Sequence, residues 1–197
     1  MSTIVVVKKN GETAIAADTL TSSASIKLSA AYKTNRQKII KFGETYLGFV
    51  GWAVNQDVFA SLMEKRPGDL HFQSSRHIFE TILKIHPVLK DEFYLRESED
   101  TYESSGMNIL VANPYGIFEI HQDRKVTEFE FFWANGSGTE YALGAMFQAY
   151  DHLRTARDIA VAGVLAATEF DQYSALPYHA YTCKLQKSPE IIEPVMI

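Results

Sequence analysis

The start of the chain carries residue types that suit nucleophilic chemistry. Ser2 follows Met1 and opens a run that continues as Thr3-Ile4-Val5-Val6-Val7. Methionine is usually removed when a small residue follows it, and its removal leaves Ser2 with both a hydroxyl and a free α-amine. An α-amine with a pKa of about 8 can take the hydroxyl proton at neutral pH, so one residue then holds a nucleophile and its base. We therefore take Ser2 as the candidate nucleophile.

A tight hairpin is predicted to bring an acid to this serine. Asn10-Gly11 is the strongest two-residue turn signal in the chain, because a type I′ turn needs positive φ at both central positions. A two-residue loop fixes the register, which sets Thr3 opposite Asp18. Asp18 is thereby expected beside Ser2 without any tertiary assumption, although an Asp that merely ends a strand fits the same pattern.

A second hairpin is predicted over residues 38–51, with its turn at Gly43-Glu44. Its register puts Lys38 and Gly51 at the same end of the sheet. A lysine there can hold an N-terminal hydroxyl poised electrostatically, and the Gly51 N–H can donate to an oxyanion. Taken singly, Lys38 is more typical of a solvated strand end, and Gly51 fits a turn between a strand and a helix.

This ordered set of residues resembles the proteasome β-subunits and HslV peptidases, which are N-terminal-nucleophile hydrolases. Residues 132–138 resemble the glycine-serine-glycine segment that precedes a helix in that family, and residues 171–174 resemble its Asp-x-x-Ser after the last long helix. The likeness covers nearly the whole chain. Residues 3–10 and 16–21 resemble in particular the bacterial proteasome-homologue branch known from betaproteobacteria.

The resemblance implies a site, a reaction and an assembly. The implied reaction is peptide-bond hydrolysis of peptides or unfolded polypeptides inside a chamber of stacked homo-oligomeric rings, and it leaves open whether an ATPase unfoldase or another regulator docks. No cofactor and no metal are implied. The implied site residues are the nucleophile Ser2, its partners Asp18 and Lys38, the oxyanion donor Gly51, and the supporting Ser137, Asp171 and Ser174.

Two departures from the family pattern matter. The nucleophile is normally Thr, and Ser2 lacks the methyl group that restricts the χ1 rotamer. Thr3 would serve only if Ser2 were also removed, which breaks the spacing to Asp18. The segment 19–37 is a few residues longer than usual, which leaves Lys33 as a rival for the lysine role. We prefer Lys38 because it directly opens the apolar strand.

Composition favours an ordinary globular protein with one domain spanning residues 1–197. The chain is 46% hydrophobic and 22% charged, which is typical of a folded core. A net charge of −5 argues against nucleic acid as the partner. The first apolar run is too short for a signal peptide or membrane span, so we expect a cytoplasmic protein without membrane contact. The histidines show no metal-ligand spacing, and Cys183 is expected to be a reduced strand residue.

The order of the remaining elements predicts an α+β fold, a four-layer αββα sandwich. Helices are expected over 55–63 and 78–89, with Pro87 kinking the second or ending it early. A later helix, capped by Ser137 or Thr139, reaches residue 150, and Thr155 caps the next, over 159–170, which is apolar nearly all round and expected between layers. The predicted later strands are 107–112, 116–120, 126–131, 180–185 and 191–195.

Three functions remain open from the sequence. The first is the N-terminal-nucleophile peptidase. The second is a catalytically silent ring scaffold, which is motivated by the serine in place of threonine and by the possibility that Met1 is retained and blocks the amine. The third is an amidase of the same superfamily that acts on small amides, although such chains are usually longer than this one.

Overall fold

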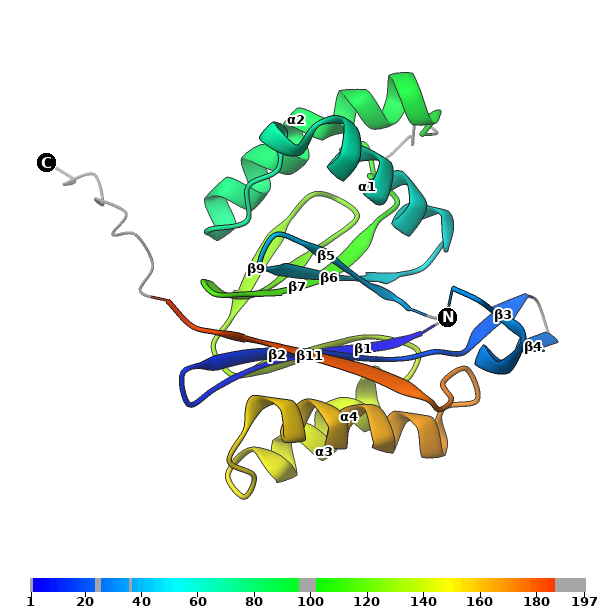
Figure 1. The fold of residues 1–197 in the computed structure, drawn as a ribbon, viewed down its shortest axis with the longest axis vertical. Coiled ribbons are helices and arrows are strands. Elements are labelled where there is room, and N and C mark those ends of the chain that lie inside the picture. The colour runs from blue at the N-terminus through cyan, green and yellow to red at the C-terminus, as the bar shows by residue number, and fades with distance from the viewer. Residues whose placement is uncertain (1, 24–25, 36, 96–101, 187–197) are drawn as a thin grey trace, which may run out of the picture.

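Two antiparallel sheets face one another, and each is covered on its outer side by a pair of helices (Figure 1). The computed structural model describes residues 2–23, 26–35, 37–95 and 102–186. This arrangement is the predicted four-layer αββα sandwich. The predicted strand at 191–195 lies outside the described residues.

The four-stranded sheet contains the first hairpin. Lys9 pairs with Glu12 and Ile4 with Ala17, which is the register that the Asn-Gly turn predicted. Strands in this sheet are covered on both faces, so the first strand is a continuous apolar run rather than an alternating one. In sheet order the strands are β10 (Phe132–Gly136), β1 (Thr3–Lys9), β2 (Glu12–Asp18) and β11 (Tyr178–Lys184).

The five-stranded sheet contains the second hairpin. Ile39 pairs with Gly48 and Phe42 with Thr45 across the turn at Gly43, again as predicted. The Lys38 carbonyl accepts a hydrogen bond from the Phe49 amide at 3.1 Å, which extends the pairing to the lysine. The strands follow sequence order as β5 (Ile39–Phe42), β6 (Thr45–Val50), β7 (Asn108–Asn113), β8 (Gly116–Ile120) and β9 (Val126–Phe129).

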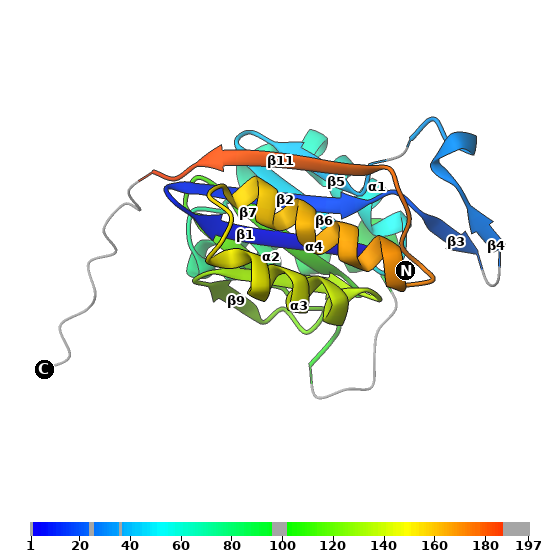
Figure 2. The ribbon, with the colours of Figure 1, turned by 90° about the horizontal axis from the view of Figure 1, so that it is seen from below.

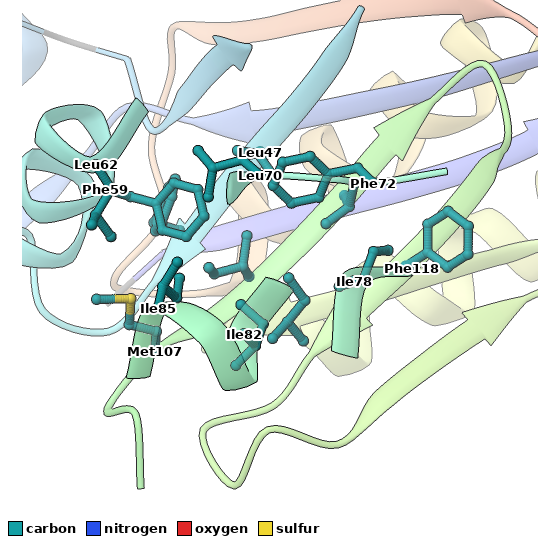
Figure 3. Packing of buried hydrophobic residues seen from close by; sticks show 14 of the residues in the cluster. Leu47, Phe59, Leu62, Leu70, Phe72, Ile78, Ile82, Ile85, Met107 and Phe118 are labelled. Carbon is teal, nitrogen blue, oxygen red and sulfur yellow. The ribbon is translucent and has the colours of Figure 1, made fainter. Parts of the chain in front are cut away.

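Three apolar layers hold the sandwich together. Alternate residues of β1 serve different layers, since Val5 and Val7 pack against one helix pair while Ile4 and Val6 pack between the sheets. A Cβ on Gly48 would lie 2.7 Å from Ile4 Cγ2, so this glycine lets the two sheets approach closely. The third layer lies under α1 (Val54–Lys65) and α2 (Ser75–Phe93), where Phe59, Phe72 and Phe118 are among the side chains that fill it (Figure 3).

A short hairpin lies beyond the sandwich, at the end where β1 begins (Figures 1 and 2). It consists of β3 (Thr21–Ser23) and β4 (Ile26–Leu28), followed by a 3₁₀ turn at Ala30–Tyr32. The sequence did not predict these elements. Each is only one turn or three residues long, and none has apolar residues at a regular spacing that would mark a buried face.

Two helices depart from expectation. Helix α2 does not end early at Pro87 but continues to Phe93, because Ile78, Ile82 and Leu89 anchor it in the core on both sides of the proline. It ends only where Tyr94 adopts a left-handed φ of 56°. The other is α4 (Ala156–Phe170), which Thr155 caps as predicted but which lies in an outer layer rather than between layers.

Helix α3 (Thr139–Tyr150) begins without the predicted side-chain cap. Its N-cap residue is Gly138, because the two candidate hydroxyls are used elsewhere. The Thr139 hydroxyl donates to the Gly136 carbonyl at 2.7 Å, and the Ser137 hydroxyl donates to Asp171 at 2.6 Å. Strand β10, which directly precedes this turn, was not predicted as a strand.

In the part of the chain that the structure describes, no helix is both long and apolar enough to cross a membrane.

Candidate active site

Backbone contacts fix Ser2 at the entrance to β1. Its carbonyl oxygen accepts a hydrogen bond from the Ser137 amide at 2.9 Å, and the residue is only 7% exposed. The approach is possible because residue 136 is glycine. A Cβ on Gly136, which has φ of +115°, would lie 1.7 Å from the Ser2 carbonyl oxygen. The glycine-serine-glycine segment thus holds the Ser2 backbone in place.

Asp18 is fully buried at the end of β2 and collects hydrogen bonds from several parts of the chain. Its Oδ1 accepts from the Thr3 amide at 2.9 Å and from Lys38 Nζ at 2.6 Å. Its Oδ2 accepts from the amides of Leu20 at 2.9 Å and Ala175 at 3.2 Å. Four donors of this kind hold a buried carboxylate in one orientation.

The two candidate lysines occupy different positions. Lys38 is buried and forms the ion pair with Asp18. Burial lowers the pKa of Lys38, an effect that Asp18 opposes and that the charge of Lys33 reinforces. Lys33 instead donates to the Thr19 carbonyl at 3.0 Å and to the Thr21 hydroxyl at 2.6 Å, and burial lowers its pKa as well. Lys38 therefore makes the direct contact with Asp18, while Lys33 lines the same cavity as Lys38.

A cavity of roughly 390 Å³ opens at this end of the molecule. Ser2, Lys38 and Gly51 all line it, as does Lys33. Gly51 follows β6 with φ of +104°, and no heavy atom lies within 4 Å of where its Cβ would be, so the space beside it is open. The cavity is also lined by residues at and just before the start of α1, namely Trp52, Ala53, Gln56 and Asp57.

Ser137, Asp171 and Ser174 form a second group that does not line this cavity. Asp171 Oδ2 accepts from both serine hydroxyls, at 2.6 Å from Ser137 and 2.7 Å from Ser174. The link between the two groups is Thr3, whose hydroxyl lies 2.7 Å from Ser174 Oγ and accepts from the Gly138 amide at 3.1 Å. Ser137 and Asp171 themselves line a separate hollow beside Phe170.

Thr3 is the residue of this region whose part the sequence did not indicate. Its amide contact with Asp18 follows from the hairpin register, but its hydroxyl contact spans 171 positions to Ser174. No local pattern predicts a partner at that separation. The Thr3 hydroxyl is fully buried and has two hydrogen-bond partners. Of the two neighbouring residues, Ser2 lines the cavity and Thr3 does not. Among the described residues, no group of three or more His, Cys, Asp or Glu is placed to hold a metal ion.

Comparison with known proteins places this geometry in a family. A solved structure of BPH from Thiobacillus denitrificans superposes with a TM-score of 0.89 at 40% sequence identity, covering 94% of this chain and 99% of that one. The chain belongs to the proteasome/HslV-type family, in the branch of the betaproteobacterial proteasome homologues. Its sandwich is the proteasome-like fold of the N-terminal-nucleophile hydrolases.

Two more structures bear on this proteasome homologue. BPH from Thiobacillus denitrificans has also been solved in complex with epoxomicin, with a TM-score of 0.87 at 39% identity over 93% of this chain and 99% of that one. Eukaryotic HslV from Trypanosoma brucei matches with a TM-score of 0.71 over 92% of this chain and 99% of that one, and at 19% identity the likeness concerns the fold alone. No protein-family model and no curated protein matches the chain.

Proposed function

We propose that this protein is a self-compartmentalising N-terminal-nucleophile peptidase that hydrolyses peptide bonds with Ser2 as nucleophile. The observation that carries the proposal is the buried ion pair of Asp18 and Lys38, 2.6 Å long, at a cavity that Ser2 and Gly51 also line. An acid, a lysine, a hydroxyl residue and an open glycine backbone are the groups that this chemistry needs. The epoxomicin complex of the homologue adds support, because that ligand binds a protein that is 39% identical.

The reaction runs in two stages. Ser2 Oγ attacks the carbonyl carbon of the substrate peptide, and its proton passes to the Ser2 α-amine, directly or through one water. The Gly51 N–H donates to the oxyanion that forms. The amine then returns the proton to the leaving nitrogen as the C–N bond breaks, and water hydrolyses the remaining ester with the amine as base. Lys38, held by Asp18, stabilises the developing negative charge on Ser2 Oγ.

The proposal is tested on protein expressed from its native start. Intact mass should show loss of Met1, and incubation with epoxomicin followed by denaturing mass spectrometry should show one adduct per chain. Ser2→Ala should abolish both the adduct and the release of a fluorophore from short peptidyl amides. Ser2→Thr should retain or raise the rate, because the β-methyl restricts the rotamer that presents the hydroxyl.

Lys38→Ala should lower turnover by at least about 10²-fold, which is the order expected of a positioned group of this kind. Covalent labelling is the decisive measurement, since a narrow substrate range can hide turnover from a small peptide panel. Met-free, assembled protein that neither labels nor turns over would reject the peptidase. The serine in place of threonine would then favour the catalytically silent ring scaffold.

Assembly into stacked homo-oligomeric rings is part of the same proposal. The layer of α3 and α4 presents apolar side chains that the sandwich itself leaves uncovered, namely Tyr141, Phe147, Leu165 and Phe170. Phe147 is 76% exposed and Phe170 is 69% exposed, and a patch of exposed apolar side chains on one helix layer can mark a contact with another protein chain. Association through this layer would cover them.

A further inference from the structure

We infer that Thr3 is a positioning residue for the proposed reaction and that its hydroxyl aligns Ser2. Through its amide and its hydroxyl, Thr3 joins Asp18 to the cluster that Ser174 forms with Asp171. The inference rests on the proposed function. Thr3 lies directly after the nucleophile in sequence but lines no part of the cavity, so it acts through Ser2 rather than on the substrate.

The peptide group between Ser2 and Thr3 is held from both sides. Its oxygen, which belongs to Ser2, accepts from the Ser137 amide, and its N–H, which belongs to Thr3, donates to Asp18. Two such contacts anchor the peptide group at two points, but they leave its plane free to rotate about the line that joins them. A third contact off that line is needed to fix the position of the Ser2 Cα and hence of its amine and hydroxyl.

The Thr3 side chain supplies that third contact, and the direction of its hydrogen bonds follows from its partners. Ser174 donates its only hydroxyl proton to Asp171 Oδ2, so at its contact with Thr3 it must accept. Thr3 therefore donates to Ser174 and accepts from the Gly138 N–H. The chain of donors runs in one direction, from Gly138 through Thr3 and Ser174 to the carboxylate, which is the arrangement in which each bond strengthens the next.

The backbone at residue 138 comes close to the Thr3 hydroxyl. A Cβ on residue 138 would lie 2.3 Å from Thr3 Oγ1 and 2.7 Å from the Ala167 Cβ, so glycine is required for the Gly138 amide to reach the hydroxyl. Thr3 is fully buried, and removing its oxygen would leave both the Gly138 N–H and the Ser174 oxygen without this partner.

The test compares Thr3→Val, which keeps the shape and removes the hydroxyl, with Thr3→Ser, which keeps the hydroxyl. A matched control is Thr13→Val. Thr13 is equally buried in the same hairpin, and its hydroxyl donates to the Asn113 carbonyl at 2.9 Å, at the opposite end of the strands. Each variant is measured as Met-free protein for kcat and KM on peptidyl amides, and for the rate of epoxomicin labelling.

We expect Thr3→Val to lower kcat and the labelling rate by on the order of 10²-fold with KM little changed, since a displacement of about 1 Å has that effect on an aligned nucleophile. Thr3→Ser should recover most of the rate, and Thr13→Val should match the wild type. Ser174→Ala should act on the same contact, so its effect and that of Thr3→Val should be less than additive in the double variant. This second variant also decides the matter if Thr3→Val does not fold.

Two negative outcomes are distinct. If the wild-type protein reacts and Thr3→Val reacts equally fast, the role of Thr3 is rejected while the peptidase stands. If Met-free wild-type protein does not react at all, the proposed function is rejected and the inference with it. A fall in rate that Thr3→Ser fails to recover, or that Thr13→Val reproduces, would show a general loss of stability and would also overturn the inference.

Discussion

At the scale of single residues, two lysines at one cavity influence each other. Burial lowers the pKa of Lys38 because the ammonium loses its hydration, and the positive charge of Lys33 lowers it further. Asp18 works in the opposite direction. The pKa of Lys38 is therefore set by burial and by both Asp18 and Lys33 rather than by the ion pair alone, and Lys33, which was the rival candidate from the sequence, becomes a modifier of Lys38.

A pH profile tests this arrangement. If turnover requires the Lys38 ammonium, the rate falls at high pH as that group loses its proton. Lys33→Met removes a like charge and so raises the pKa of Lys38, which should move the alkaline limb of kcat/KM to higher pH. Lys33→Arg keeps the charge and should leave the limb near its wild-type position. An alkaline limb that stays fixed in Lys33→Met would contradict the coupling.

At the scale of elements, the junction of β10 with α3 determines where β1 begins. Gly136 and Gly138 each allow a backbone approach that any side chain would block, to the Ser2 carbonyl and to the Thr3 hydroxyl respectively. The same short segment also supplies the Ser137 amide. The start of β1 is thus set by three consecutive residues of a turn that is distant in the sequence.

Substitution of a glycine at this junction should destabilise the protein, whereas substitution of another glycine, in the helix that follows, should not. Gly136→Ala is expected to destabilise the protein by on the order of 3 kcal/mol or more, because its Cβ overlaps the Ser2 carbonyl and its φ is left-handed. The matched control is Gly144→Ala in α3, where no heavy atom beyond the adjacent residues and the helix's own backbone lies within 4 Å of the added Cβ. It should stabilise by about 0.5–1 kcal/mol. Urea unfolding followed by circular dichroism measures both, and equal stabilities would refute the account.

The sequence was informative where contacts are local. Both hairpin registers were predicted correctly, because a two-residue turn leaves one pairing, and the contact of Asp18 with Thr3 followed from the first of them. Strand β10 was missed, because residues 132–136 are few and pair with β1 across more than half of the chain. The link from Thr3 to Ser174 was missed for the same reason, since only the folded sandwich brings them together.

At the scale of the whole molecule, both helix layers leave large apolar side chains exposed, and the most exposed aromatic side chains within the α-helices lie on α3 and α4. The α3 and α4 layer carries Phe147 and Phe170 on its outer surface, and the Tyr141 ring packs against the Phe170 ring in a tilted arrangement, with ring centroids 5.7 Å apart. Helix α4 looked apolar nearly all round in the sequence, which suggested burial between layers. Its outer position and the exposure of Leu165, at 42%, instead make it part of the surface that we propose to be covered in the assembly.

Sedimentation tests this interpretation of the face. Phe147→Asp should shift the protein from a large assembly toward the 22.2 kDa monomer, because a charge would be buried in the contact. Phe147→Leu keeps an apolar side chain and should retain the assembly. Circular dichroism confirms that both variants are folded. A wild-type protein that sediments only as a monomer at micromolar concentration would exclude this assembly.

The four hydrogen bonds on Asp18 have a consequence for the order of events during synthesis. Its donors come from residues 3, 20, 38 and 175, and the strand that flanks it on the other side from β1 is β11, at residues 178–184. A growing chain therefore releases Ser2 first but lacks Asp171, Ser174 and the Ala175 amide until nearly all of the sandwich has left the ribosome. We therefore expect the proposed nucleophile to lack its complete site while the polypeptide is being made, because the surroundings of Asp18 are completed only when β11 joins the sheet.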